Sequence, residues 1–310
     1  PPTNPRSFDN VQLEVQTHYL LFSEARTLAQ NGDLESARAM IVSILNTVDE
    51  VPRNGGFFND IADFVLLQLD DADEAMKIIN RSIQLNPQLA ISYATKGQIL
   101  ESLKHYSDAV EAYRKAIDLG FEHVRFYTKV AMTIRYHLPT AQANELEVIE
   151  LLKKGVALAV HWPAAHDQLA RVLANARDEA LRDPKSALEH AEVNFRWLSE
   201  NDGEIDAYAF ATLGMAQYRV GQYEQAIGNL TRTLDATGDP LAPIEVFLAM
   251  AYWQLGNKEQ AAEWFSRNTF GPENKIFGHV VQEASLLMGL PIQADAEAVD
   301  EDAEASAESE

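Results

Sequence analysis

The sequence contains no cysteine, and this single absence removes several functions. Without thiols the chain forms no disulfide bond, offers no thiolate nucleophile and binds no metal ion through cysteine. The absence suits an exported protein, in which an unpaired thiol is a hazard, and it suits a cytoplasmic protein equally. The compartment is therefore left open between the cytoplasm and an exported or periplasmic location reached after removal of an upstream segment.

Basic clusters and long apolar runs are also lacking. The chain has 25 Lys and Arg residues against 47 Asp and Glu residues, a formal net charge of -22. Because phosphate contacts need clustered Lys and Arg, nucleic acid is not an expected partner. No apolar run approaches the roughly 18 residues that span a bilayer, and no signal-peptide pattern opens the chain, so no direct membrane insertion is expected. The chain begins with Pro1-Pro2 rather than Met, which favours a piece or a processed product of a longer protein.

Catalytic and metal-binding motifs are missing as well. The sequence has no Gly-x-Gly-x-x-Gly, no Gly-x-x-x-x-Gly-Lys and no Gly-x-Ser-x-Gly, which are signatures of nucleotide-binding proteins and hydrolases. Its eight histidines form no His-Glu-x-x-His motif, and His161 and His166 are separated by a segment that contains Trp162-Pro163. We expect no enzymatic activity, no metal ion and no cofactor.

What the sequence does contain is a pattern that recurs about every 34 residues. A small residue and an aromatic lie on one expected helix, and an alanine, a bulky residue and a small residue lie on the next. The sharpest copies contain Tyr93, Gly97, Ala109, Tyr113 and Ala116, and then Phe210, Leu213, Gly214, Tyr223, Ala226 and Leu230. This period is typical of a helix-turn-helix solenoid, in which small residues let paired helices approach closely.

The pattern predicts about seven helix pairs followed by one capping helix. Clear pairs are expected over 11–48, 57–85, 91–119, 205–236 and 241–268. The helices of the fourth pair are joined by residues 137–145, and the fifth pair carries an insertion at 177–182 before Asp183-Pro184, where a helix restarts because Asp then Pro is a good N-cap and first-turn combination. The amphipathic segment 272–290 is expected to cover the last apolar face.

The two ends of the chain have a different composition. Residues 1–10 are expected to be an extended lead-in or linker, and residues 11–290 the superhelical domain. Residues 291–310 are expected to be a disordered acidic tail, with eight acidic residues and no basic one over 295–310. Two interpretations of the tail stay open: a solubilising end, or an electrostatic arm that recruits a basic partner or folds over the groove described below.

The repeated residues resemble those of the tetratricopeptide repeat family, over 11–268 with 272–290 as the cap. The resemblance implies an all-α, right-handed α-solenoid whose first helices line a concave groove that binds peptides, helices or tails of partner proteins. A carboxylate clamp for chaperone tails is disfavoured, because its positions hold Phe22 and Arg26, Asp60 and Phe64, and Ala94 and Gln98. Residues 245–265 also resemble the last repeats of large bacterial proteins, which favours a bacterial origin.

Alignment of the first helices projects a set of Arg, Tyr, Met and Trp side chains into this groove. Such side chains are typical of protein-binding hot spots. The alternative is that the tyrosines pack on neighbouring helices and the arginines pair with carboxylates. The candidate groove residues are Arg26, Arg125, Met132, Arg135, Tyr136, Arg171, Tyr208, Met215, Tyr218, Arg219, Met250 and Trp253, flanked by Tyr19, Phe22, Asp167 and Asn175.

These observations predict a non-enzymatic interaction scaffold that binds a peptide or helix of a partner protein in its groove. Two other functions stay open. The chain could be an assembly subunit that self-associates through solenoid surfaces, or the C-terminal regulatory region of a larger enzyme.

Overall fold

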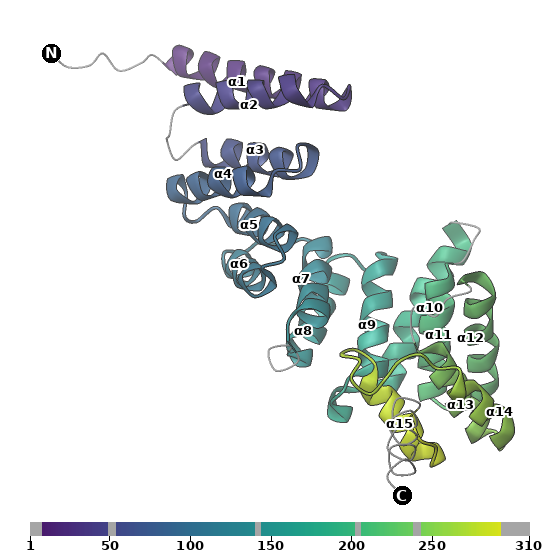
Figure 1. Cartoon of the computed structure of the whole chain (residues 1–310). Helices are drawn as coiled ribbons and strands as arrows, with labels where there is room; N and C mark the ends of the chain where they lie inside the picture. Colours follow the sequence, from purple (N-terminus) through teal and green to yellow (C-terminus); the bar gives the residue numbers. More distant parts are fainter. Residues whose placement is uncertain (1–7, 49–53, 140–143, 202–205, 238–242, 293–310) are drawn as a thin grey trace, which may run out of the picture. The chain divides into compact units, whose positions relative to one another are not determined.

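A computed structural model describes residues 8–48, 54–139, 144–201, 206–237 and 243–292 (Figure 1). Its contacts divide the chain into two compact units, Pro1–Glu122 and His123–Glu310. Unit 1 contains α1 (Phe8–Gln30), α2 (Leu34–Thr47), α3 (Gly55–Gln68), α4 (Ala72–Leu85), α5 (Ala90–Ser102) and α6 (Tyr106–Asp118). Unit 2 contains α7 (Val124–His137), α8 (Glu145–Leu158), α9 (Pro163–Asn175), the 3-10 helix η2 (Glu179–Leu181), α10 (Pro184–Asn201), α11 (Ala207–Arg219), α12 (Tyr223–Thr237), α13 (Ile244–Gln254), α14 (Lys258–Ser266) and α15 (Gly278–Met288).

Consecutive helices pack as pairs along both units. The pairs are α1/α2, α3/α4, α5/α6, α7/α8, α9/α10, α11/α12 and α13/α14. Four first helices pack chiefly on the second helix of the pair before them: α5 on α4, α9 on α8, α11 on α10 and α13 on α12. Helix α3 instead packs on the first helix α1. No strand occurs in the described ranges. The predicted all-α solenoid of about seven helix pairs is confirmed.

Local sequence fixes where many of the helices begin. The side chains of Asp33 and Asp71 accept hydrogen bonds from backbone N–H groups of the first turns of α2 and α4. The predicted restart at Asp183-Pro184 is confirmed, because α10 begins at Pro184 and Asp183 Oδ1 accepts a 3.0 Å hydrogen bond from the Ser186 backbone N–H. Gly32 connects α1 to α2 with a φ of 84°, a left-handed conformation that favours glycine.

The ends of the chain fall largely outside the described residues. Helix α1 begins at Phe8, so only the first seven residues of the expected lead-in stand before it. The expected acidic tail is described only at Pro291 and Ile292. A single superhelical domain over 11–290 stays a prediction.

Small residues let the helices of a pair approach, as the repeat pattern predicts. A Cβ added at Gly97 would lie 2.3 Å from the Tyr113 ring, which is fully buried. A Cβ added at Gly214 would lie 2.7 Å from Leu230 Cγ and 3.2 Å from the Ala226 carbonyl oxygen. Gly228 lies in the same α11/α12 pair, but nothing lies within 4 Å of its added Cβ.

Alanine at these two glycines of unit 2 is expected to have opposite effects. Gly214→Ala should lower the free energy of unfolding by about 1–3 kcal/mol, because the Ala226 backbone prevents α11 and α12 from relieving the overlap. Gly228→Ala should raise it by about 0.5–1 kcal/mol through helix propensity. Urea unfolding of both variants measures the difference, and shifts of the same sign would contradict the packing described.

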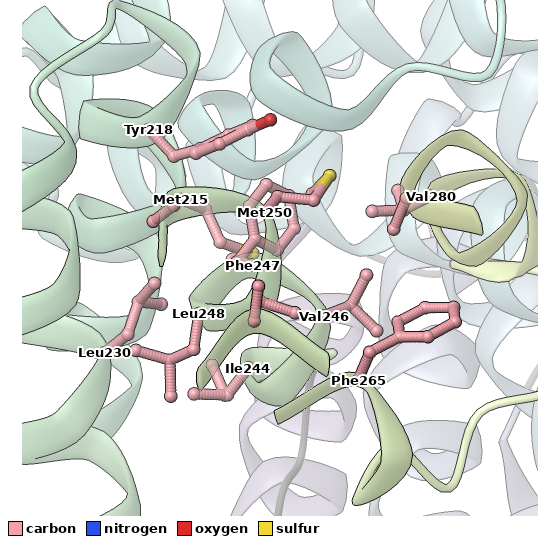
Figure 2. Packing of buried hydrophobic residues seen from close by; sticks show 14 of the residues in the cluster. Met215, Tyr218, Leu230, Ile244, Val246, Phe247, Leu248, Met250, Phe265 and Val280 are labelled. Atoms are coloured by element: carbon pink, nitrogen blue, oxygen red, sulfur yellow. The ribbon is translucent and has the colours of Figure 1, made fainter. Parts of the chain in front are cut away.

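Unit 2 has one large apolar core around α13. Ile244, Val246, Phe247, Leu248 and Met250 are all 0% exposed and pack with residues of α11, α12, α14 and α15 (Figure 2). Every residue of α13 from Ile244 to Ala251 is buried, and all of them except Glu245 are apolar, as expected for a helix enclosed by its neighbours.

Candidate functional site

A cleft opens in unit 1 between the first helices α1 and α3. Its volume is about 600 Å³. The residues that line it are Tyr19, Phe22, Ser23, Arg26, Gln30, Asp60, Asp63, Phe64, Leu67 and Gln68. The structure thus brings the expected groove residue Arg26 and its neighbours Tyr19 and Phe22 together with side chains of α3.

The cleft has a fixed apolar floor and an exposed apolar rim. Phe22 and Phe64 are 7% and 6% exposed, and their rings meet edge-on with centroids 5.5 Å apart. The Tyr19 ring lies tilted against the buried Phe57 ring, with centroids 4.6 Å apart. Tyr19 and Leu67, however, are 47% and 64% exposed. These two side chains present apolar area that a ligand can cover without disturbing the core.

Both signs of charge border the cleft. Burial raises the pKa of the Asp60 carboxyl above its usual range, and the neighbouring charge of Asp63 raises it further. A hydrogen bond from Asn59 and the charge of Arg26 act in the opposite direction. The Asp60 carboxylate is thus destabilised where it stands, and an additional cation beside it would be favourable.

Three of the expected groove residues of unit 2 lie in the core instead. Met215, Tyr218 and Met250 are 1%, 8% and 0% exposed and belong to the cluster around Phe247. The expectation that they line an open groove is therefore corrected. Other helices of unit 2 cover the side of α11 and α13 that carries these residues. A position on a first helix therefore does not by itself make a side chain accessible to a ligand.

The expected residues on α7 have diverse environments. Tyr136 is 40% exposed and Met132 is half-buried. The exposed Arg125 guanidinium lies 4.6 Å from the centroid of the Trp162 ring. Arg135 is buried, its Nη1 has no hydrogen-bond partner in the described part of the chain, and burial lowers its pKa below the usual value.

Arg171 and Tyr208 form a small cluster between α9 and α11. Arg171 Nε lies 3.1 Å from Asp167 Oδ2 and donates a 2.8 Å hydrogen bond to Thr212 Oγ1. Its guanidinium lies 5.2 Å from the Tyr208 ring, which is 39% exposed. This arginine pairs with a carboxylate, which is the alternative that the sequence left open.

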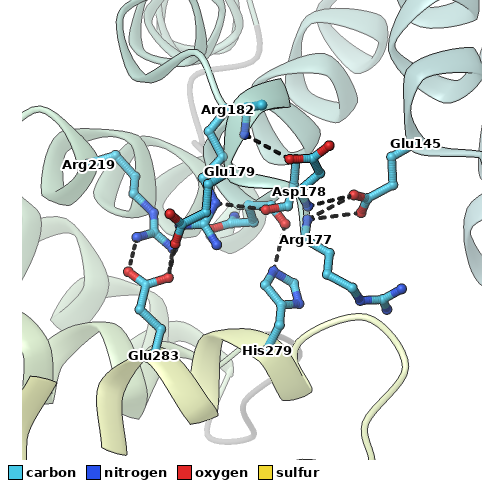
Figure 3. A network of polar contacts seen from close by, with 11 residues as sticks. Glu145, Arg177, Asp178, Glu179, Arg182, Arg219, His279 and Glu283 are labelled. Atoms are coloured by element: carbon cyan, nitrogen blue, oxygen red, sulfur yellow. Dashed lines mark hydrogen bonds and ion pairs between the residues drawn. The ribbon is translucent and has the colours of Figure 1, made fainter. Parts of the chain in front are cut away.

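Arg219 is engaged by α15 (Figure 3). Its Nη1 and Nη2 donate to the two carboxylate oxygens of Glu283, the second at 3.1 Å. The same guanidinium lies 5.3 Å from the Phe247 ring centroid. The last expected groove residue, Trp253, is half-buried and has the Lys258 ammonium 4.8 Å from its ring centroid.

Sequence reasoning missed the residues that hold α15 in place. Glu283 also lies 3.1 Å from Arg182 Nη1, His279 Nε2 lies 3.0 Å from the Asn175 carbonyl oxygen, and Arg177 Nη2 donates a 2.6 Å hydrogen bond to the Lys275 carbonyl oxygen. The signal that the sequence does give is the insertion at 177–182, which contains Arg177 and Arg182.

The described residues offer little to a metal ion. His166 and His190 meet through their Nδ1 atoms at 2.9 Å, and His166 Nε2 lies 2.8 Å from the Val160 carbonyl oxygen. Over the described ranges no group of three or more His, Asp or Glu side chains is placed to hold a metal. Nor does any described helix combine the length and the apolar composition needed to cross a bilayer.

Comparison with known proteins gives the family. Two models of the tetratricopeptide repeat family match, one over residues 212–271 and one over 90–120. No curated protein matches the sequence. A tetratricopeptide repeat protein from Parabacteroides merdae has a similar structure, with 12% identity and a TM-score of 0.50 over 87% of this chain and 99% of its own.

Two further structures are less similar. YrrB, described as a tetratricopeptide protein with an unusual peptide-binding site, has 18% identity and a TM-score of 0.49 over 64% of this chain and 90% of its own. The protein pilF of Pseudomonas aeruginosa has 15% identity and a TM-score of 0.47 over 69% of this chain and 91% of its own. The family matches and the stacked helix pairs together show that the chain contains tetratricopeptide repeats, at residues 90–120 and 212–271, within a longer array of helix pairs.

Proposed function

We propose that this chain is a non-enzymatic scaffold that binds a peptide or helical segment of a partner protein, and that the cleft between α1 and α3 is where it does so. Tetratricopeptide repeats are protein-interaction modules, which supports the general role. The observation that carries the specific proposal is the combination of exposed Tyr19 and Leu67 above a buried aromatic floor.

The physical argument concerns surface area and charge. Tyr and Leu side chains on the rim give a ligand apolar contact area, and the rigid floor limits the entropy lost on binding. Asp60 and Asp63 face one arginine, Arg26, across the cleft. We therefore expect the bound segment to carry an apolar anchor and a Lys or Arg that reaches Asp60.

A charged side chain on the rim should abolish most of this binding. Leu67→Asp is expected to weaken a cleft-bound peptide at least about tenfold, because it removes apolar contact and adds a third carboxylate beside two others. Val42→Asp is the matched control: Val42 is 53% exposed, lies on the second helix α2 and is absent from the cleft lining. The same substitution there should leave affinity unchanged.

The test needs peptides selected without knowledge of the partner. A displayed library of random peptides is enriched on the unmodified chain, and the selected peptides are synthesised and titrated against the Leu67→Asp and Val42→Asp proteins. Binding that survives Val42→Asp and fails with Leu67→Asp supports the proposal. Peptides that bind both variants equally would place the site elsewhere.

Self-association and a regulatory role within a larger enzyme stay predictions. Light scattering over a range of protein concentrations tests the first, since a scaffold for other proteins keeps the mass of one chain.

A further inference from the structure

Helix α15 packs differently from the first helices α9, α11 and α13 of the same unit. Each of those three helices packs chiefly on the second helix of the pair before it, whereas α15 packs chiefly on α13, itself a first helix. Its side chains also reach the ends of α9 and α11 through His279 and Glu283. Helix α15 therefore covers part of the surface that first helices form in unit 2, rather than only closing the end of the last pair.

The apolar side of α15 fits this surface well. Val280, Val281 and Ala284 are 0% exposed and Met288 is 5% exposed, and all four belong to the core cluster that contains Phe247 and Met250. Figure 2 shows Val280 with these two residues. Val280, Ala284 and Met288 are four residues apart, which is the spacing of one helix face. This side of α15 is held by ordinary apolar burial.

The polar side of α15 is a carboxylate clasped by two arginines (Figure 3). Arg219 binds Glu283 through both Nη atoms, and Arg182 Nη1 lies 3.1 Å from Glu283 Oε2. The two guanidinium side chains are only 7% and 13% exposed, against 27% for Glu283. In a chain of net charge -22, two nearly buried arginines aimed at one carboxylate form a site selective for an acidic side chain.

The fit leaves polar atoms unsatisfied on α15 and on the residues that it contacts. Arg219 Nε, Asn175 Oδ1 and His279 Nδ1 are buried and have no hydrogen-bond partner among the described residues. A buried donor or acceptor without a partner is destabilising. The surface thus offers one more donor and one more acceptor than α15 uses, and a different helix could satisfy them.

We propose that the surface around Arg182 and Arg219 is a second binding site, that it takes an acidic amphipathic helix of a partner protein, and that α15 is an intramolecular occupant that this helix displaces. The ligand carries a glutamate at the place of Glu283 and small or medium apolar residues at the places of Val280, Ala284 and Met288. This site lies in unit 2 and uses none of the residues of the α1/α3 cleft, so the experiment that tests it is independent of the proposal for that cleft.

The probe for the experiment is a fluorescent synthetic peptide with the sequence of residues 272–292, added to the full chain. Glu283→Arg places a cation opposite two arginines and detaches α15, so this variant should bind the peptide at least about tenfold more tightly than the unmodified chain, whose site is filled. A peptide with Glu283→Gln should bind the variant at least about tenfold more weakly than the original peptide. Glu273→Arg is the control chain: it makes the same change of charge at an exposed position before α15 and should bind like the unmodified chain.

Circular dichroism of each chain confirms that the helices persist. If Glu283→Arg lowers helicity, Glu283→Gln replaces it, and the same ranking of affinities is expected. Equal affinity of a folded variant and the unmodified chain, or equal affinity for the two peptides, would overturn the proposal. An unmodified chain with the mass of a dimer in light scattering would identify a second copy, exchanging α15, as the occupant in place of a partner protein.

Discussion

Replacing Phe247 by alanine is expected to lower the free energy of unfolding of unit 2 by about 3–5 kcal/mol. Phe247 is 0% exposed, its ring meets Tyr218 edge-on at 5.4 Å, and the Arg219 guanidinium lies 5.3 Å from its centroid. Truncation removes these contacts and leaves a cavity that α11, α14 and α15 cannot close, because each is held by other contacts of the same core.

Tryptophan fluorescence during urea unfolding measures this effect in one unit. All four tryptophans lie in unit 2, at positions 162, 197, 253 and 264. Leu286→Ala is the control: Leu286 is 84% exposed on α15, so its truncation should change the free energy of unfolding by no more than about 0.5 kcal/mol. Similar losses in the two variants would show that Phe247 is not central to the core.

The helix pairs could be predicted from the sequence because a repeat fixes them locally. Gly97 and Tyr113, and likewise Gly214 and Leu230, lie at repeat positions whose packing is the same in each pair. The Asp183-Pro184 restart follows from capping chemistry within four residues. Features of this kind depend on neighbours in sequence, and they are confirmed.

The open surfaces could not be predicted in the same way. Helical register places Met215 and Met250 on the side of their helices expected to face a groove, but does not say what covers that side. Both methionines are buried in a cluster that includes residues of α13 and α15. The repeat pattern predicts that these two helices exist, but it does not predict which surface they cover. For Arg26, by contrast, neighbouring first helices leave a cleft, and the expected position lines it.

The position of α15 is the feature that the sequence predicts least well. Its amphipathic pattern predicts a helix with one buried face, yet Glu283 meets Arg219 across 64 residues and His279 meets Asn175 across 104. Such pairings depend on how the helices of unit 2 stack between these distant positions. The predicted cap is present as a helix, and the surface that it covers is new information.

Lowering the pH from about 7.5 to about 5 is expected to loosen α15. His279 lies on α15 with its Nε2 3.0 Å from the Asn175 carbonyl oxygen, so this nitrogen carries the proton and donates. Burial lowers the pKa of His279 to about 4, and the positive charges of Arg182 and Arg177 add to this effect, while the Asn175 carbonyl and the charge of Glu145 oppose it. The attached helix thus resists a second proton on this imidazole.

The sign of the pH effect follows from comparing the two states. On a detached α15 the imidazole has an ordinary pKa near 6.5, so the detached form takes up a proton as the pH falls from about 6.5 to about 4 and the attached form does not. The unfavourable shift at pH 5 is about 1 kcal/mol once solvent screening of this partly exposed site is allowed for. Glu283 acts in the same direction at lower pH. Burial raises the pKa of Glu283, but Arg219 and Arg182 lower it by more, so this pKa lies below its ordinary value. The stability that Glu283 gives to the attached helix is therefore lost only as the pH falls below about 4.5.

Backbone hydrogen exchange over residues 278–288 measures the loosening. Protection factors, each referred to the intrinsic exchange rate at its own pH, should fall about fivefold between pH 7.5 and pH 5. His279→Gln keeps an Nε2 donor and does not titrate, so its protection should stay constant, whereas His161→Gln, at an exposed position of the same unit, should retain the fall. A fall of equal size in His279→Gln would assign the pH response to a group other than His279.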